Sequence, residues 1–138
     1  MMNEITRTLI ATPDRIAATA KLFGHAFPLQ FEPFVYTVAR EMAPAYNGGY
    51  WHFYRLSNNG FYMAPDIDGP FQASCASNFF RGNLSADALG IVACLTAYSH
   101  LSFSKEQKLA WTCADQFYLL RDYADMHREA AEIFRAID

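Results

Sequence analysis

The stretch 48–69, which reads GGYWHFYRLSNNGFYMAPDIDG, constrains the fold of this chain more than any other part of the sequence. Two runs rich in aromatic residues flank an Asn-Asn-Gly turn at 58–60, and a second turn, Pro-Asp-Ile-Asp-Gly, follows at 65–69. Asparagine, aspartate and glycine are favoured where the backbone reverses. Because short connections force neighbouring strands to be antiparallel, the stretch predicts a β-meander with an unusual density of aromatic rings.

The meander is expected to contain four strands, at 50–57, 60–64, 70–76 and 79–84. Side chains alternate between the two faces of a strand. In the first strand one face therefore carries Trp51 and Phe53, and the other face also carries aromatic side chains. Such a sheet needs cover on both sides, or it keeps one face for a partner.

Helical periodicity predicts two helices before the meander, which follow a short strand at 5–10. The first helix is expected to begin at Thr12, with threonine as the N-cap and proline at the first helical position, and to stop at Gly24. The second is expected to begin at Pro33 and to end at Pro44. Proline is tolerated in the first turn of a helix but not in its interior, which fixes both of these boundaries.

Three further helices are predicted after the meander. Ser85 caps the first, whose segment 88–95 is apolar all round and therefore predicts a buried helix. A capping box at 104–107 opens the second, which is expected to run to about Tyr123. Asp125 is expected to cap the last, through Ile137. The chain of 138 residues is thus predicted to form one α+β domain over 1–138, an antiparallel meander packed against about five helices.

The charge balance argues against two classes of function, a DNA mimic and a DNA-binding accessory protein, the second of which stays open as a less favoured hypothesis. A duplex carries one negative charge per ~1.7 Å of its axis, so a protein that imitates DNA needs dense arrays of carboxylates. Here 14 acidic residues are offset by 11 basic ones, for a net charge of −3, and the acids are spread along the chain. DNA mimicry is therefore not expected. The basic excess of a DNA-binding protein is also missing.

The cysteines and the apolar segments indicate the compartment. Cys75, Cys94 and Cys113 form no C-x-x-C pair and are odd in number, which argues against a secreted disulfide framework. The N-terminus lacks the pattern of a signal peptide, and the most apolar run, 88–95, is too short to span a bilayer. We expect a cytoplasmic protein with no membrane association.

The helix predicted from Ser104 has a second face that stands opposite its apolar stripe. Residues at i, i+4, i+7 and i+11 share a face of a helix, and here they are two rings and two carboxylates: Trp111, Asp115, Tyr118 and Asp122. Exposed, they are typical of a protein–protein patch, because aromatic anchors supply much of an interface's energy. The alternative, to which we give more weight, is a helix covered on both sides with both rings in a second small core.

The turn 65–69 is the other acidic feature. Asp66 and Asp68 are ordinary turn residues, since aspartate bonds nearby backbone amides; alternatively, they point outward to meet the basic groups of a partner. A calcium loop fits poorly, because the EF-hand spacing would place Ala64 at the first ligand position and Cys75 at the last.

The four histidines lie outside any zinc or catalytic motif, and no phosphate-binding loop is present. We therefore expect no metal and no cofactor. An enzyme or ligand-binding domain stays open as the alternative, with a pocket between meander and helices and His52 or His100 as the base. A pair of Cys94 with His100 is disfavoured, because a thiolate is unstable within an apolar helix.

Three ordered blocks, 48–66, 85–103 and 118–138, resemble the antirestriction protein family of the ArdB and KlcA type. The last two blocks read SADALGIVACLTAYSHLSF and YLLRDYADMHREAAEIFRAID. The resemblance is weaker towards the N-terminus. Family members often carry an Arg-His-Phe-Gly-like element where this chain has KLFGH at 21–25, and this departure leaves the role of that segment open.

The resemblance implies a compact α+β protein that protects incoming plasmid or phage DNA by inhibiting host type I restriction–modification. It implies no catalysis, no cofactor and no DNA mimicry. The implied partner is the restriction complex or a factor that controls it, contacted without direct DNA binding. The oligomeric state stays open, since the Trp111 and Tyr118 stripe equally suits a homodimer seam. Asp122 is the first choice among the expected contact residues, which also include Asp66, Asp68, Arg121, Tyr50, Trp51, Trp111 and Tyr118.

Overall fold

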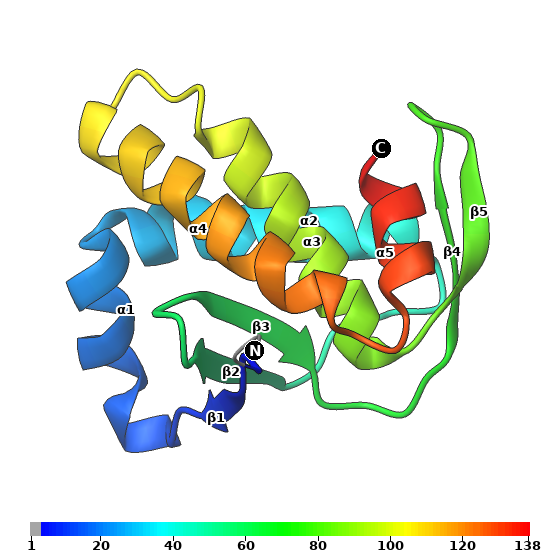
Figure 1. Ribbon diagram of the computed structural model, residues 1–138, viewed down its shortest axis with the longest axis horizontal. Coiled ribbons are helices and arrows are strands. Elements are labelled where there is room, and N and C mark those ends of the chain that lie inside the picture. Colours follow the sequence, from blue (N-terminus) through cyan, green and yellow to red (C-terminus); the bar gives the residue numbers. More distant parts are fainter. Residues whose placement is uncertain (1–3) are drawn as a thin grey trace.

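Two small antiparallel sheets and five α-helices make up the fold in the computed structural model, which describes residues 4–138 (Figure 1). The first sheet has the order β1-β2-β3, from strands Arg7–Leu9, Trp51–Leu56 and Phe61–Pro65. The second sheet pairs β4 (Phe71–Cys75) with β5 (Phe80–Leu84). The α+β class, the antiparallel pairing and the approximate number of helices are confirmed.

The helices lie where the periodicity predicts them. They are α1 (Arg15–Phe23), α2 (Glu32–Met42), α3 (Ala86–Leu101), α4 (Gln107–Asp125) and α5 (Ala130–Ile137). A 3-10 turn, Thr12–Asp14, precedes α1, and a π-helical turn, Phe27–Phe31, leads into α2. Gly24 ends α1 in the left-handed region, at a φ of 58° that a glycine adopts without strain. Among residues 4–138, the helices all lack the combination of length and apolar character that a bilayer crossing requires.

Helix α3 is the centre of the molecule and runs between the two sheets (Figure 1). One stripe of α3 lies directly against the open edge of β3. The Tyr98 hydroxyl donates to the backbone oxygen of Phe61 at 2.7 Å, and the Cys94 sulfur lies 3.5 Å from the backbone nitrogen of Met63 and 3.6 Å from its oxygen. Side chains of α3 thus satisfy backbone groups that a further strand would otherwise pair.

The four predicted strands exist, but they do not form one continuous meander. Strands β3 and β4 belong to different sheets, so the expectation of a single four-stranded sheet is wrong on this point. The physical reason is that α3 occupies the edge of β3 that β4 would need. The connection after β3 instead passes the start of α3, where a Cβ on Gly69 would lie 3.1 Å from the backbone nitrogen of Ala86.

One of the predicted caps is confirmed and three are wrong. The Ser85 hydroxyl accepts from the backbone N–H of Ala88 at 3.1 Å and caps α3 as predicted. Ser104 instead accepts from the N–H of Glu106, so the turn tightens before α4 and no capping box forms. Asp125 does not cap α5, because burial of Ala124 carries α4 on through it. Thr12 bonds the Tyr50 hydroxyl at 2.9 Å rather than the helix.

Candidate functional site

The outer face of α4 carries the exposed aromatic and acidic side chains that the spacing predicts. Trp111 is 63% exposed and Tyr118 is 61% exposed, and Asp115 and Asp122 are exposed as well. The opposite face packs into the core through Leu109, Cys113, Leu120 and Ala124. The interpretation in which both rings are buried in a second core is therefore wrong. We call Trp111, Asp115, Tyr118 and Asp122 the α4 stripe.

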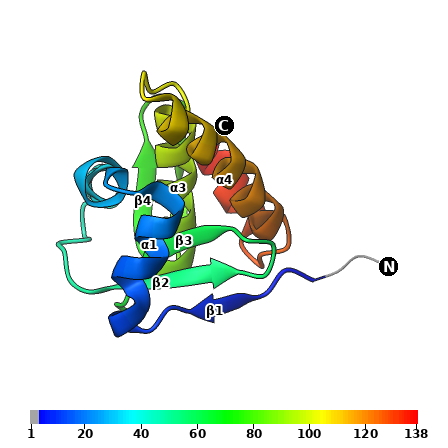
Figure 2. The same ribbon diagram turned by 90° about the vertical axis from the view of Figure 1, so that its left-hand side faces the viewer.

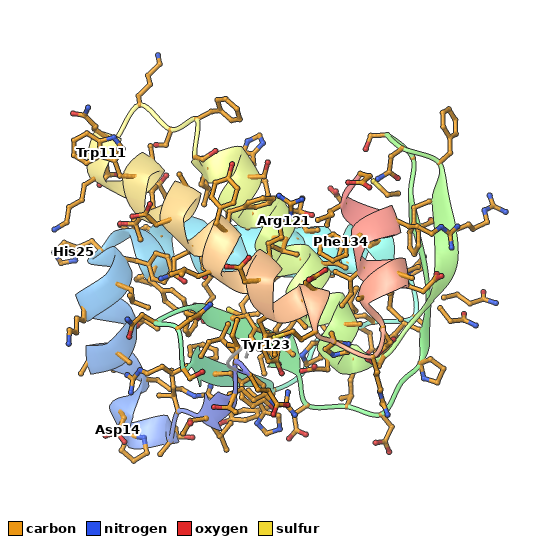
Figure 3. All side chains as sticks on the ribbon, in the orientation of Figure 1. Asp14, His25, Trp111, Arg121, Tyr123 and Phe134 are labelled. Atoms are coloured by element: carbon orange, nitrogen blue, oxygen red, sulfur yellow. The ribbon has the colours of Figure 1, made fainter. Side chains whose placement is uncertain are left out.

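The two carboxylates of the α4 stripe have no polar partner within the described residues. Asp115 and Asp122 form no ion pair or side-chain hydrogen bond with any residue of 4–138. Tyr118 is held by an edge-on contact with Phe117, with ring centroids 5.5 Å apart. Trp111 stands at one end of α4 (Figure 3). Alternating rings and unpaired carboxylates suit a partner that offers apolar and cationic groups.

Arg121 is exposed but lies beside the stripe and not within it. Its guanidinium carbon is 5.9 Å from the ring centroid of Phe134 on α5, and the two side chains lie close together in Figure 3. The contact is at the outer limit of a cation–π interaction. Arg121 thus turns toward α5, where it would flank a partner seated on the α4 stripe.

Trp51 does not belong to any surface, and its expected role in partner contact is wrong. The residue is 2% exposed. Its indole N–H donates to the Tyr46 hydroxyl at 2.7 Å, and its ring lies edge-on to Tyr36 at 5.2 Å. The buried polar atom is therefore satisfied by a core partner, which favours burial of the whole ring. Tyr50, one residue earlier, is 49% exposed, with the Arg15 guanidinium 4.7 Å from its ring centroid.

The acidic turn lies apart from α4. Asp66 and Asp68 are exposed, as predicted, and Asp66 Oδ1 lies 3.0 Å from His52 Nε2. The turn leaves the end of β3 toward β4 (Figure 1), and Figure 2 shows α4 on the opposite side of the molecule from α1. The structure therefore brings together the four residues of the α4 stripe, and leaves Asp66, Asp68 and Tyr50 elsewhere on the surface.

Neither histidine proposed as a catalytic base lies in a deep polar pocket. His52 is engaged by Asp66, and His100 is exposed with its ring 4.7 Å from that of Phe34. Burial raises the pKa of the Cys94 thiol to about 12, so it stays protonated at neutral pH. The arrangement does not supply the base or the nucleophile that the enzymatic alternative invoked at these positions.

A cluster of polar side chains centred on Asp87 was not predicted from the sequence. Asp87 Oδ1 accepts from Arg7 at 2.6 Å and from the Tyr62 hydroxyl at 2.8 Å, and Oδ2 lies 2.9 Å from His127 Nε2. We call Arg7, Tyr62, Asp87 and His127 the Asp87 cluster. It borders a cavity of about 500 Å³ between the N-terminal segment and the α4–α5 connection. Its members are far apart in sequence, so no local motif could reveal it.

His127 in this cluster is bound at both ring nitrogens. Its Nδ1 accepts from the backbone N–H of Glu129 at 3.0 Å, while Nε2 faces Asp87. Neutral histidine has one donor and one acceptor nitrogen, so the tautomer that fits has the hydrogen on Nε2, and Nε2–H donates a hydrogen bond to Asp87. No ring nitrogen is left to act on a substrate. The cluster links β1, β3, α3 and the α4–α5 connection by hydrogen bonds.

The charge of Asp87 is stabilised by its neighbours. Burial alone would raise its pKa, but hydrogen bonds from His127 and Tyr62 and the charge of Arg7 outweigh burial and hold the pKa below its ordinary value. Burial and the nearby Asp87 charge raise the pKa of Tyr62, which keeps its hydroxyl proton as a donor. The cluster thus holds one carboxylate, one protonated phenol and one guanidinium at neutral pH.

Replacing Asp87 with asparagine is expected to lower the free energy of unfolding by about 2 kcal/mol at pH 7, since charged hydrogen bonds are lost. Because the folded-state pKa of Asp87 is lowered, its contribution is complete above about pH 4 and disappears as the pH falls through the folded pKa. Urea unfolding of wild type and Asp87→Asn at pH 7 and pH 3 checks this. A stability difference that does not narrow at low pH would contradict the assignment.

A second cavity, of about 590 Å³, lies between α1, the start of α2 and Phe53 of β2. Its wall is mainly apolar and includes Ile16, Ala20 and Pro28. Arg15 at its border already donates to the backbone oxygen of Trp51 at 2.7 Å. This is where the ligand-binding alternative would place a ligand. Among residues 4–138, no group of three His, Cys, Asp or Glu side chains is arranged to hold a metal ion.

Comparison with known proteins gives the same family from sequence and from structure. The family model described as "Antirestriction protein" matches residues 44–138. An antirestriction protein KlcA of Escherichia coli is 41% identical over 97% of this chain and 95% of its own length. The putative antirestriction protein YubI of Escherichia coli K12 is 37% identical over 91% of this chain and 90% of its own length.

A solved structure shares the whole fold. It comes from work on KlcA and ArdB that describes a novel fold and antirestriction activity against type I DNA restriction systems in vivo but not in vitro. The match has a TM-score of 0.89 and 40% identity, and it covers 100% of this chain and 99% of the other. A family model over residues 44–138, near-full-length relatives and a shared fold lead to one conclusion: this chain belongs to the antirestriction protein family.

Proposed function

We propose that this protein protects incoming plasmid or phage DNA in the cytoplasm by inhibiting a host type I restriction–modification system. It does so by binding a protein partner through the α4 stripe, without catalysis and without imitating DNA. The observation that carries the proposal is the exposure of Trp111 and Tyr118, which alternate along α4 with two carboxylates that have no partner in residues 4–138. Family membership supplies the system that is opposed.

The chemistry of the buried groups supports a non-catalytic mode of action. Burial raises the pKa values of the Cys94 and Cys113 thiols to about 12 each, so neither is a ready nucleophile. His127 has both ring nitrogens engaged. The net charge of −3 supports action without DNA mimicry. Binding a protein requires none of the groups that catalysis would need.

The partner is the restriction complex itself or a cellular factor that controls it. The solved relatives act in vivo but not in vitro, which favours a partner or condition that purified components lack. Direct DNA binding is not part of the proposal, because 11 basic residues against 14 acidic ones give no electrostatic attraction to phosphates.

Plating of unmodified phage on cells that carry an active type I system tests the function. Expression of the wild-type protein is expected to restore plating toward the level seen on non-restricting cells. Several type I families should be tried, with soluble protein verified in each strain. Unchanged plating in all of them would overturn the proposed function. The ligand-binding alternative, with its ligand in the cavity between α1 and β2, would then be the favoured hypothesis.

Asp122→Ala is expected to leave the protein folded and to weaken protection about tenfold, which is the scale for loss of one interfacial charge contact. Asp122 is exposed and unpaired within residues 4–138, so its removal costs the fold little. The measurement is phage plating combined with thermal unfolding. Glu41→Ala, which removes an exposed acid on α2, is the matched control.

A triple variant, Asp122→Ala with Asp66→Ala and Asp68→Ala, tests whether the 65–69 turn contributes to partner contact in addition to the α4 stripe. If Asp66 and Asp68 also contact the partner, the triple alanine variant protects less than Asp122→Ala alone. Full protection by the triple variant, with folded protein, would reject both acidic features as contact sites while leaving the family function intact.

A further inference from the structure

Phe79, at the tip of the β4–β5 hairpin, combines a disfavoured backbone with an exposed ring. Its φ is 61°, in the left-handed region where glycine and asparagine are the usual residues. Its side chain is 93% exposed. A phenylalanine here gains almost nothing from burial and is strained by its backbone. Strain of this kind persists only where the surrounding structure enforces it, and it clusters at functional sites.

The residues on either side of Phe79 enforce this conformation. Asn78 Oδ1 accepts from the backbone N–H of Phe80 at 3.0 Å, and Asn78 Nδ2 donates to the backbone oxygen of Ala136 at 2.9 Å. Phe80 is buried at 4% exposure, with the Arg135 guanidinium 5.4 Å from its ring centroid. Both neighbours are thus fixed to the end of α5, and the chain between them must direct Phe79 outward.

The hairpin that carries Phe79 projects at the opposite end of the molecule from α1 (Figure 1). Its outer face is polar and has one charged side chain: the exposed residues there are Gln72, Ser74, Arg81 and Asn83. The segment 69–86 has no acidic residue. An aromatic anchor within a polar, weakly charged rim matches the anatomy of a protein–protein hot spot. A single arginine on the hairpin is too little positive charge for a surface that binds the phosphates of a nucleic acid.

We propose that Phe79 is an anchor that inserts into an apolar pocket on the protein partner, with the polar face of the hairpin forming the rim of the contact. This inference rests on the proposed function, and it adds a contact remote from Trp111 on α4. The backbone on either side of the ring is already fixed by Asn78, so binding has little additional main chain to order. Glycine or asparagine at position 79 would relieve the backbone strain. Either substitution would also remove the ring that contacts the partner.

Phe79→Gly and Phe79→Asn test the proposal, because both residues suit a φ of 61°. Each variant is expected to unfold within about 2 °C of wild type or at a higher temperature, since strain is relieved and no buried contact is lost. Each is also expected to protect unmodified phage at least about tenfold less than wild type, as for a truncated hot spot. Phe103→Gly is the control, because that ring is 87% exposed in an ordinary loop.

The outcomes separate this inference from the proposed function. Protection by wild type and by Phe103→Gly, with loss in both Phe79 variants at undiminished stability, supports the anchor. Full protection by the Phe79 variants would overturn the anchor and leave the function standing. A marked drop in their unfolding temperature would also overturn it, since the ring would then serve the fold. Absence of protection by wild type would remove the function on which the inference rests.

The same variants exclude other occupants for the ring. If wild type elutes as a dimer in gel filtration and Phe79→Gly as a monomer, the ring seats in a second copy, and the proposal fails. If wild type shifts duplex or single-stranded DNA in a gel and Phe79→Gly does not, the ring stacks on bases, and the proposal also fails. Equal elution and equal DNA mobility for both proteins support a distinct protein partner.

Discussion

Gly90→Ala is expected to destabilise the fold by about 3 kcal/mol, at the upper end of the usual cost of overpacking a close contact. A Cβ at this position would lie 2.4 Å from the backbone oxygen of Met63 and 2.5 Å from Ala64. These are atoms of β3, which cannot move aside as a flexible side chain could. In an ordinary helix interior the same change would stabilise by up to about 1 kcal/mol, so the predicted effect has the opposite sign.

Thermal or urea unfolding of Gly90→Ala measures this, and Gly82→Ala is the matched control. A Cβ on Gly82 would meet a carboxylate oxygen of Glu132 at 2.7 Å, which is the end of an adjustable side chain, and next a ring carbon of Phe80 at 3.2 Å, which need give only by a few tenths of an ångström. We therefore expect Gly82→Ala to change stability by less than about 1 kcal/mol. Equal stability of Gly90→Ala and wild type would show that α3 does not need its close approach to β3.

Trp111→Ala combined with Tyr118→Ala is expected to abolish most protection while the protein stays folded. Both rings are largely exposed, so their loss costs the core almost nothing. As aromatic anchors of an interface, each would be worth about 2 kcal/mol, or about 30-fold in affinity, and the pair should weaken binding by about 1,000-fold if the two contributions add. Phage plating measures protection, and circular dichroism verifies the fold.

Ile16→Ala serves as the control for the double variant, because that side chain is 84% exposed on α1, away from the α4 stripe. It should protect like wild type. Undiminished protection by the Trp111 and Tyr118 double variant would reject the α4 stripe as the contact surface. A shift from dimer to monomer in gel filtration would instead show that the rings form a homodimer seam.

Local features of the sequence predicted local features of the structure well. The Asn-Asn-Gly turn joins β2 to β3, with Asn59 at a φ of 74° and the Asn58 side chain accepting from the Gly60 N–H at 3.0 Å. Helical spacing alone predicted that Trp111, Asp115, Tyr118 and Asp122 share one face of α4, but not that this face is exposed, since the buried alternative was given more weight. In each case the information lies within a few residues of the chain, where turn chemistry and periodicity act.

Features that depend on distant residues were missed or wrong. The split of the meander into two sheets depends on Cys94 and Tyr98 reaching β3, which strand patterns do not encode. Burial of Trp51 depends on a hydroxyl supplied by Tyr46 in a preceding loop. Alternation along β2 identified the residues that share a face, but not how each face is covered. Such contacts follow from the tertiary arrangement and not from spacing.

The Asp87 cluster has a consequence for how the chain acquires its fold during synthesis. Arg7 and Asp87 are 80 residues apart, and Asp87 and His127 are 40 apart. Closing loops of this length is entropically slow and needs both ends present. Strand β1 is made first, yet its anchor is complete only when the α4–α5 connection has left the ribosome. The Asp87 cluster is therefore completed late: a chain interrupted before His127 can still pair β1 with β2 and place Arg7 on Asp87, but it lacks the histidine bond to that carboxylate.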